Sequence, residues 1–366
     1  MTRRDFIINA ALLGLAPSLV SALSACRKEN YSASDFEQAP KTDAHFHYNT
    51  FDDAYLTYAN SLGMHILSIN VNAEESIDRQ LDIVTGLRKQ HPGMIDFLGT
   101  FLVNDFGKDD FVDRIIARIN LCMDLGARGI KIWKNIGMDL QDEHGNYVMA
   151  DNPAFAPVFA YLEKQGIPLT AHLGEPKNCW LPIEEMTVKG NQAYYRQNPQ
   201  YHMYQHPEMP SYEQQIAARD HLLERYPKLS FVGAHLGSLE WSIDEIAKRF
   251  DAHPRFAVDT AARVQFLQLQ ALQDRDKMVS FLTKYQDRIL YGTDITLTEK
   301  DPAKREEQKK KLHDKWVQDW NFFATDEFVP TTQFVDESLP KEMKGLSLPR
   351  DIVDKIFYGN TKRIFG

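Results

Sequence analysis

Two histidines one residue apart, His45 and His47, end the short segment Lys-Thr-Asp-Ala-His-Phe-His. Successive side chains of a β-strand point to opposite faces, so in a strand both imidazoles would emerge on the same side. Neutral imidazole is a ligand for zinc and its neighbours in the first transition series. The pair is therefore a candidate half of a metal site, although for the pair alone the alternative of two ordinary strand or turn histidines stays open.

Further ionisable residues end other apolar runs of the chain. They are Lys131 in Gly-Ile-Lys, His172 in Pro-Leu-Thr-Ala-His, His235 in Phe-Val-Gly-Ala-His and Asp294 in Ile-Leu-Tyr-Gly-Thr-Asp. Any one of them could be a capping or solvated residue. Together with the two histidines they end five separate apolar runs, and this repetition indicates a shared site.

The apolar runs are rich in β-formers and alternate with segments that carry apolar residues at helical spacing, such as Ile77, Leu81, Val84 and Leu87. Continuous apolar strands that alternate with helices indicate a buried parallel sheet. Eight such units predict an α/β fold, a (β/α)₈ TIM barrel with its chemistry at the C-terminal ends of the strands. The expected strands are residues 42–47, 65–71, 95–103, 129–133, 168–172, 229–235, 256–260 and 288–294.

Two long insertions, after strands 5 and 8, interrupt the short loops expected of a barrel. The first, residues 174–210, is rich in aromatic residues and includes Trp180. We expect either a lid or specificity wall over the site or an aromatic cluster that covers the barrel, and the two are compatible. The second begins with the charged residues 300–315 and continues with Trp316 and Trp320; it predicts a solvated helix with one packed face.

The N-terminal segment has the pattern of an export signal. Arg3 and Arg4 precede an apolar stretch that is too short to span a membrane, and Leu-Ser-Ala-Cys26 resembles a bacterial lipobox. We expect a Tat-type signal peptide over residues 1–26 with Cys26 as the first mature residue, a polar tether over 27–39 and the catalytic domain over 40–366. The alternative is an ordinary cleavage site with a chance cysteine. The prediction is an exported lipoprotein, periplasmic or at the cell surface, with an N-terminal lipid anchor.

Composition narrows the classes of partner. The 366 residues carry a formal net charge of −9, which argues against nucleic-acid binding because that needs a clustered basic surface. Cys122 lies in an apolar helical pattern and Cys179 in the first insertion, so no disulfide is expected. The expected partner is a small molecule, and whether the chain forms a homo-oligomer stays open.

Taken together, these motifs resemble the amidohydrolase superfamily. The resemblance lies in His45-Phe-His47, Ala-His172-Leu-Gly-Glu-Pro, Gly-Ala-His235-Leu-Gly and Tyr-Gly-Thr-Asp294. The closing Phe-Tyr-Gly-Asn360-Thr-Lys-Arg-Ile-Phe is similar to the amidohydrolase-related (amidohydrolase 2) branch, whose members include metal-dependent hydrolases, decarboxylases and hydratases. The resemblance covers residues 41–366 and is specific for the family but not for the reaction.

The resemblance implies that His45, His47, His172 and Asp294 bind a divalent metal, zinc first, with manganese, iron or cobalt as alternatives. Asp294 would also move a proton between water and the leaving group, and His235 would face the substrate oxygen on which negative charge develops.

Lys131 admits two interpretations. Strand alternation places Lys131 and Trp133 on the inner face and Ile130 and Ile132 on the outer face. With one metal, which the closest branch favours, the lysine would contact substrate or a carboxylate. In a binuclear site it would be carboxylated and bridge two ions, with His172 and His235 on the second ion.

These residues predict a hydrolase of a lactone, ester or amide. A lyase, either a decarboxylase or a hydratase, would use the same ligands, and a non-catalytic binding lipoprotein would be expected to have lost some of them. Candidate substrate contacts are Trp133, Glu175, Trp180, Asp259 and Arg263, with surface salt bridges as the alternative for the last two. Lys131 and Arg263 would suit an anionic substrate, which favours the lyase slightly.

Overall fold

The computed structural model of the chain describes residues 30–73, 75–298 and 301–366. The predicted signal peptide, residues 1–26, lies outside the described residues. Among those residues, no helix has the length and apolar character that crossing a membrane requires.

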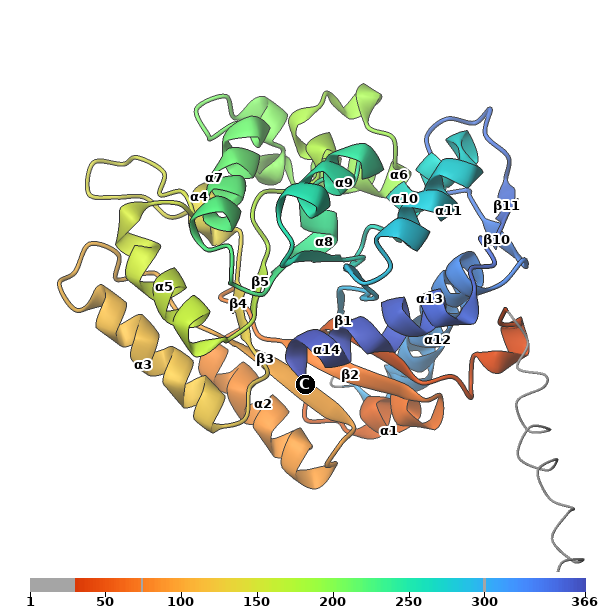
Figure 1. Cartoon of the computed structure of the whole chain (residues 1–366), viewed down its shortest axis with the longest axis horizontal. Helices are drawn as coiled ribbons and strands as arrows, with labels where there is room; N and C mark the ends of the chain where they lie inside the picture. Colours follow the sequence, from red (N-terminus) through yellow and green to blue (C-terminus); the bar gives the residue numbers. More distant parts are fainter. Residues whose placement is uncertain (1–29, 74, 299–300) are drawn as a thin grey trace, which may run out of the picture.

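A nine-stranded sheet forms the centre of the molecule, with the order β8-β7-β6-β5-β4-β3-β2-β1-β9 (Figure 1). Every neighbouring pair of strands is parallel. The strands are β1 Lys41–Tyr48, β2 Met64–Ile69, β3 Ile95–Thr100, β4 Ile130–Ile132, β5 Leu169–Ala171, β6 Phe231–Gly233, β7 Phe256–Asp259, β8 Ile289–Leu290 and β9 Ile295–Leu297.

The sheet closes where the end of the barrel meets its beginning. The backbone N–H of Ala44 in β1 donates to the carbonyl of Tyr291 directly after β8, at 2.9 Å. β9 continues the same segment and also pairs with β1. At Gly292 a Cβ atom would lie 2.8 Å from the Cβ of His45, so only glycine permits this approach. The fold is the predicted α/β TIM barrel. The predicted eighth strand, residues 288–294, contains the short β8, and β9 follows directly after it.

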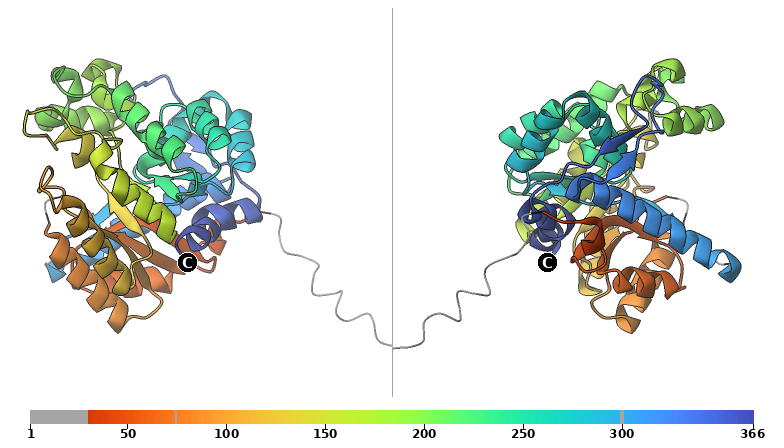
Figure 2. Two further views of the ribbon diagram at one scale, coloured as in Figure 1. Left: turned by 60° about the vertical axis from the view of Figure 1, so that its left-hand side comes forward. Right: turned by 90° about the vertical axis from the view of Figure 1, so that its right-hand side faces the viewer.

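Helices cover the outside of the barrel (Figures 1 and 2). In α3, for example, Phe111, Ile115, Ile119 and Cys122 recur every three to four residues and are buried against the sheet. The helices of eight or more residues are α1 Ala54–Ser61, α2 Ile77–Gln90, α3 Phe111–Asp124, α5 Ala156–Gln165, α6 Lys189–Gln197, α7 Tyr212–Arg225, α9 Ile243–Ala252, α10 Val264–Gln273, α11 Arg275–Lys284 and α12 Arg305–Ala324. The C-terminal end adds α13 Arg350–Asp354 and α14 Asn360–Phe365.

Side chains alternate between the two faces of each strand, so the core of the barrel consists of two separate apolar clusters. Ile130 and Ile132 of β4 belong to the large apolar cluster between strands and helices. A smaller cluster, which includes Leu67, Leu98 and Val232, fills the barrel and is closed by Phe365 of α14. The isoleucines on either side of Lys131 therefore face the helices, as predicted, and Lys131 faces the interior.

Both insertions contain regular secondary structure. The first contains α6 between short 3₁₀ turns, and Tyr195 and Met203 form a small core with Cys179. The second contains α12, the long blue helix in the right-hand view of Figure 2, followed by the antiparallel strands β10 Phe328–Pro330 and β11 Glu342–Lys344. Cys122 and Cys179 are both free and buried, as expected.

The segment before β1 differs from the expectation of a free tether over residues 27–39. Tyr31, Phe36 and Ala39 are buried, and the Tyr31 ring lies 4.8 Å from the ring of Trp320 in α12. The Tyr31 hydroxyl donates to Asp354 at 2.6 Å. Residues 30–39 therefore pack on the body of the domain, because two aromatic side chains in a polar segment find an apolar surface.

Lys41 holds this segment in place. Its buried ammonium donates to the carbonyl oxygens of Phe36, of Ala39 at 2.6 Å and of Leu62 at 2.8 Å. Burial lowers the pKa of Lys41 to about 8, and nearby Glu37 opposes this shift. The side chain is thus still mostly charged at neutral pH.

We expect Lys41→Met to lower the free energy of unfolding by about 2–3 kcal/mol, because three carbonyl groups lose a charged donor. Urea denaturation of the mature protein measures the loss. Lys89→Met is the matched control, since Lys89 is exposed in the last turn of α2. Equal stability of the two variants would show that the buried ammonium does not stabilise the docked segment.

Candidate metal centre and active site

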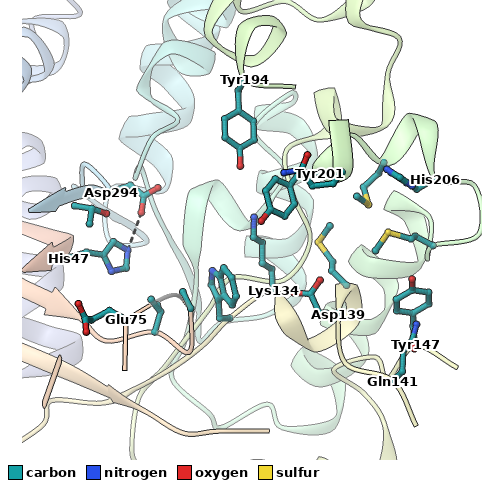
Figure 3. Close-up of a pocket in the computed structure, with 18 of the residues that line it drawn as sticks. His47, Glu75, Lys134, Asp139, Gln141, Tyr147, Tyr194, Tyr201, His206 and Asp294 are labelled. Atoms are coloured by element: carbon teal, nitrogen blue, oxygen red, sulfur yellow. Dashed lines mark hydrogen bonds and ion pairs between the residues drawn. The ribbon is translucent and has the colours of Figure 1, made fainter. Parts of the chain in front are cut away.

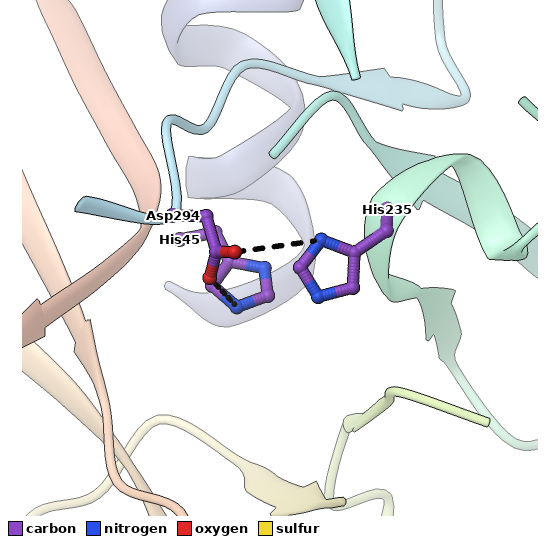
Figure 4. A group of neighbouring side chains, drawn as sticks. All are labelled: His45, His235 and Asp294. Atoms are coloured by element: carbon purple, nitrogen blue, oxygen red, sulfur yellow. Dashed lines mark ion pairs between the residues drawn. The ribbon is translucent and has the colours of Figure 1, made fainter. Parts of the chain in front are cut away.

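The residues singled out at the strand ends meet inside one end of the barrel. An oxygen of Asp294, Oδ1, lies 3.2 Å from His47 Nε2 and 3.4 Å from His45 Nε2. Its other oxygen lies 4.0 Å from His235 Nδ1. Figure 4 shows His45, His235 and Asp294 facing one another, and one ligand atom from each lies within 4.8 Å of the others.

His172 and Lys131 complete the group. His172 Nδ1 lies 3.2 Å from His235 Nε2, and the Lys131 ammonium lies 3.4 Å from His45 Nε2. The predicted ligands His45, His47 and Asp294 therefore meet directly, whereas His172 joins the group through His235 and Lys131 joins it through His45.

The histidine rings are oriented by hydrogen bonds on their far side. Nδ1 of His47 lies 2.7 Å from the carbonyl of Ile69, and Nδ1 of His235 lies 2.9 Å from the carbonyl of Ala261. Nδ1 of His45 lies 2.7 Å from a carboxylate oxygen of Asp259. Carbonyl and carboxylate oxygens accept, so each Nδ1 carries the hydrogen and each Nε2 presents a lone pair.

The resulting donor set fits a divalent cation. His47 Nε2 and Asp294 Oδ1, both acceptors, approach to 3.2 Å. The buried His172 Nε2 has no hydrogen-bond partner among the described residues, and its nearest carboxylate, Glu175, is 3.7 Å away. Converging imidazole and carboxylate lone pairs repel one another unless a cation lies between them, and this combination is the usual zinc set.

The ionisation states agree with this chemistry. Burial lowers the pKa of His172 to about 4 and lowers the pKa values of His45 and His235, so all three imidazoles are neutral at pH 7. Burial alone would raise the pKa of Asp294, but His235, His47 and His45 outweigh it and hold that pKa well below its usual value. Neutral imidazole and ionised carboxylate are the forms that bind metal.

Two of these residues have a backbone conformation that L-residues rarely adopt. Asp294 has φ +67° and His235 has φ +59°. The backbone N–H of Asp294 donates to the carbonyl of His45 at 2.7 Å, which fixes the turn against β1. Such conformations cost about 1 kcal/mol or more each and persist where the surroundings impose them, often at functional sites.

Asp259 has a different position from the one expected. It was a candidate substrate contact, but it is buried behind His45. Its second oxygen accepts from the backbone N–H groups of His235 at 2.8 Å and Ala261 at 3.1 Å. Asp259 thus orients two histidines at once.

Asp43 is a supporting residue that the sequence reasoning missed. It accepts from the Thr293 hydroxyl at 2.6 Å and from the Trp316 indole at 3.0 Å, and burial raises its pKa to about 6. The sequence gives only a weak indication of this role, namely that a carboxylate lies two residues before His45.

Lys131 is buried inside the barrel beside His45. Burial lowers its pKa to about 8, against the opposing charges of Asp259 and Asp294. Its inward position agrees with the prediction from strand alternation.

A cavity of about 990 Å³ opens beside this centre, with His47 and Asp294 in its wall (Figure 3). Of the candidate substrate contacts, Trp133 lines it. Glu175 is buried and forms an ion pair with Lys134, which does line the cavity.

Two other candidates lie elsewhere. The Trp180 ring packs 5.5 Å from the ring of Tyr212, and Arg263 Nη1 donates to the Ala262 carbonyl at 2.9 Å. Neither belongs to the described lining of the cavity. Asp139, Gln141 and Tyr147 do line it; the sequence reasoning missed them because the loop after β4 shows no periodicity.

A family model described as Amidohydrolase matches residues 43–366. Among solved structures, the chain is similar to 4-oxalomesaconate hydratase from Rhodopseudomonas palustris, at 12% identity over 89% of this chain and 95% of that chain, with a TM-score of 0.44. It is also similar to an amidohydrolase from Mycobacterium avium subsp. paratuberculosis K-10, at 12% identity over 86% of this chain and 74% of that chain, with a TM-score of 0.42. Comparison with curated proteins gave no match.

Proposed function

The chain belongs to the amidohydrolase family, and from this premise we propose that it is a metal-dependent hydrolase of a lactone, ester or amide. The observation that supports the proposal most directly is the close approach of His47 Nε2 and Asp294 Oδ1, 3.2 Å apart in the wall of a substrate-sized cavity. Each group presents a lone pair there, and a cation relieves their repulsion.

His45, His47, His172 and Asp294 would hold the cation, and zinc suits three imidazoles and one carboxylate best, with manganese, iron and cobalt as alternatives. Bound there, a divalent cation supplies Lewis acidity and lowers the pKa of a water molecule from 15.7 to about 7. Asp259 and the Ile69 carbonyl would keep the His45 and His47 rings in the ligand orientation.

Asp294 is the residue best placed to move a proton. Its side chain is 31% exposed and lines the cavity, so it can reach an attacking water and a leaving group. Its low pKa keeps it ionised before reaction. A carboxylate so placed takes a proton from water and returns it to the departing oxygen or nitrogen.

The hydrolase is favoured over the lyase by the charge around the cavity. Lys131 and Arg263 would suit an anionic substrate, but neither belongs to the described lining of the cavity. The lining lysine, Lys134, is paired with Glu175. Export and lipid anchoring through Arg3, Arg4 and Cys26 remain a separate proposal from the sequence.

The test is to assay zinc-loaded mature protein with lactones, esters and amides, and in parallel with aromatic carboxylates for decarboxylation and with unsaturated acids for hydration. We expect turnover of at least one uncharged substrate class, loss of at least about 100-fold on chelation and recovery with zinc. Turnover confined to the carboxylate arms would make the protein a lyase. Hydrolysis that survives complete metal removal would overturn the metal-dependent mechanism.

A further inference from the structure

The cavity is larger than the reacting bond requires. Figure 3 shows His47 and Asp294 at one end and Tyr147 and His206 at the other, with Lys134 and Tyr201 between them. Its volume of about 990 Å³ lies at the upper end of the range of about 300–1,000 Å³ usual for ligand sites. The substrate therefore has room for a second group beyond the bond that is cleaved.

Aromatic rings and thioethers make up much of the part away from Asp294. Tyr201 and Tyr194 line it with side chains that are 43% and 44% exposed, and their rings lie nearly parallel, at 11° and 6.4 Å between centroids. Trp133, Tyr147 and Met209 are further lining residues. Exposed ring faces in a cavity offer stacking surfaces, and tyrosine hydroxyls add hydrogen bonds.

The basic side chain of this part already has a partner. Lys134 is the only lysine or arginine among the described lining residues, and the buried carboxylate of Glu175 binds its ammonium. His206 lies 3.3 Å from Glu208. An anionic group bound here would be desolvated without a free cationic partner.

We propose that the region between Lys134 and Met209 is a distal subsite for an uncharged ring of the substrate, aromatic or sugar, which stacks on Tyr201 and Tyr147. The inference rests on the proposed function for the reacting end. Tyr147 comes from the loop after β4 and Tyr201 from the insertion after β5, whereas the candidate ligands lie in β1 and directly after β5 and β8. Ring binding and metal binding can therefore be changed separately.

The test uses calorimetric titration of metal-free mature protein with benzamide, methyl β-D-glucopyranoside and benzoate at millimolar concentrations. Benzamide and benzoate match in size and differ in charge, and the glucoside distinguishes a sugar from an aromatic ring. We expect at least one uncharged probe to bind more tightly than benzoate. Tyr201→Ala and Tyr147→Ala should each weaken that binding about three- to tenfold.

Tyr204→Ala is the matched control, since Tyr204 belongs to the same insertion and is 54% exposed but does not line the cavity. Its binding should stay within about twofold of the unchanged protein. In the reverse test, Asp139→Lys adds a cation to the lining and should strengthen benzoate binding about threefold or more. Asp82→Lys, exposed on α2, should not.

Benzoate binding as tight as that of the uncharged probes in the unchanged protein, equal losses in Tyr201→Ala and Tyr204→Ala, or no binding of either uncharged probe would overturn the distal subsite. Because the titration contains no metal and measures no turnover, it can succeed where the hydrolase assay fails. It can also fail while hydrolysis is found.

Discussion

Asp294→Asn is expected to remove most of the divalent metal from the mature protein and to lower turnover by roughly 10²–10⁴ from lost proton transfer alone. The carboxylate lies 3.4 Å from His45 Nε2 and 3.2 Å from His47 Nε2, so its charge would balance that of a bound cation. Asparagine tolerates the left-handed φ of +67° at this position, which keeps the backbone turn intact. The loss therefore reports on the carboxylate and not on misfolding.

Elemental analysis and steady-state kinetics measure the two effects. His45→Ala should lose metal as well, because it removes another ligand. Asp139→Asn is the matched control, a carboxylate in the wall of the same cavity away from the histidines, and it should keep its metal. Unchanged metal content in both Asp294→Asn and His45→Ala would show that other residues bind the metal.

The barrel could be predicted because its strands are buried on both faces. The expected strand over residues 168–172 contains β5, Leu169–Ala171, and its last residue is His172 of the candidate metal centre. In a parallel barrel every strand ends at the same side, so a polar residue after an apolar run indicates both the strand end and the site. His172 and His235 were found in this way, whereas Lys131 lies within β4 and its inward direction was predicted from strand alternation.

Side chains in loops could not be placed by the same reasoning. Trp180 and Arg263 lie beyond the strand ends, where no alternation fixes the direction of a side chain, and both lie outside the described lining. Asp259 was expected to contact substrate or a surface partner, but it contacts His45. The sequence does not predict this contact because the two residues lie 214 positions apart. The predicted eighth strand ends early, at Leu290, and β9 begins only after Asp294, whose left-handed φ an aspartate does not predict.

Lys131 is the residue on which the choice between one metal and two depends. Lys131 is buried 3.4 Å from His45 Nε2, and its pKa is lowered to about 8. A neutral amine is the form that carbon dioxide can carboxylate, so the lowered pKa keeps the bridged, binuclear alternative chemically accessible. In the mononuclear site that we favour, the ammonium acts on its neighbours through charge and binds no metal.

Lys131→Met is therefore expected to leave the metal content at about one equivalent while it lowers turnover, because it retains volume in the barrel but removes the ammonium. His235→Asn should likewise keep the metal and cost roughly 10²–10³ in turnover, and asparagine again tolerates the left-handed backbone. Metal analysis of both variants beside the unchanged protein distinguishes one metal from two.

Two equivalents of metal that fall in both variants, with bicarbonate needed for reconstitution, would make Lys131 and His235 ligands of a binuclear centre. Metal loss in His235→Asn alone would make His235 a ligand of a single ion.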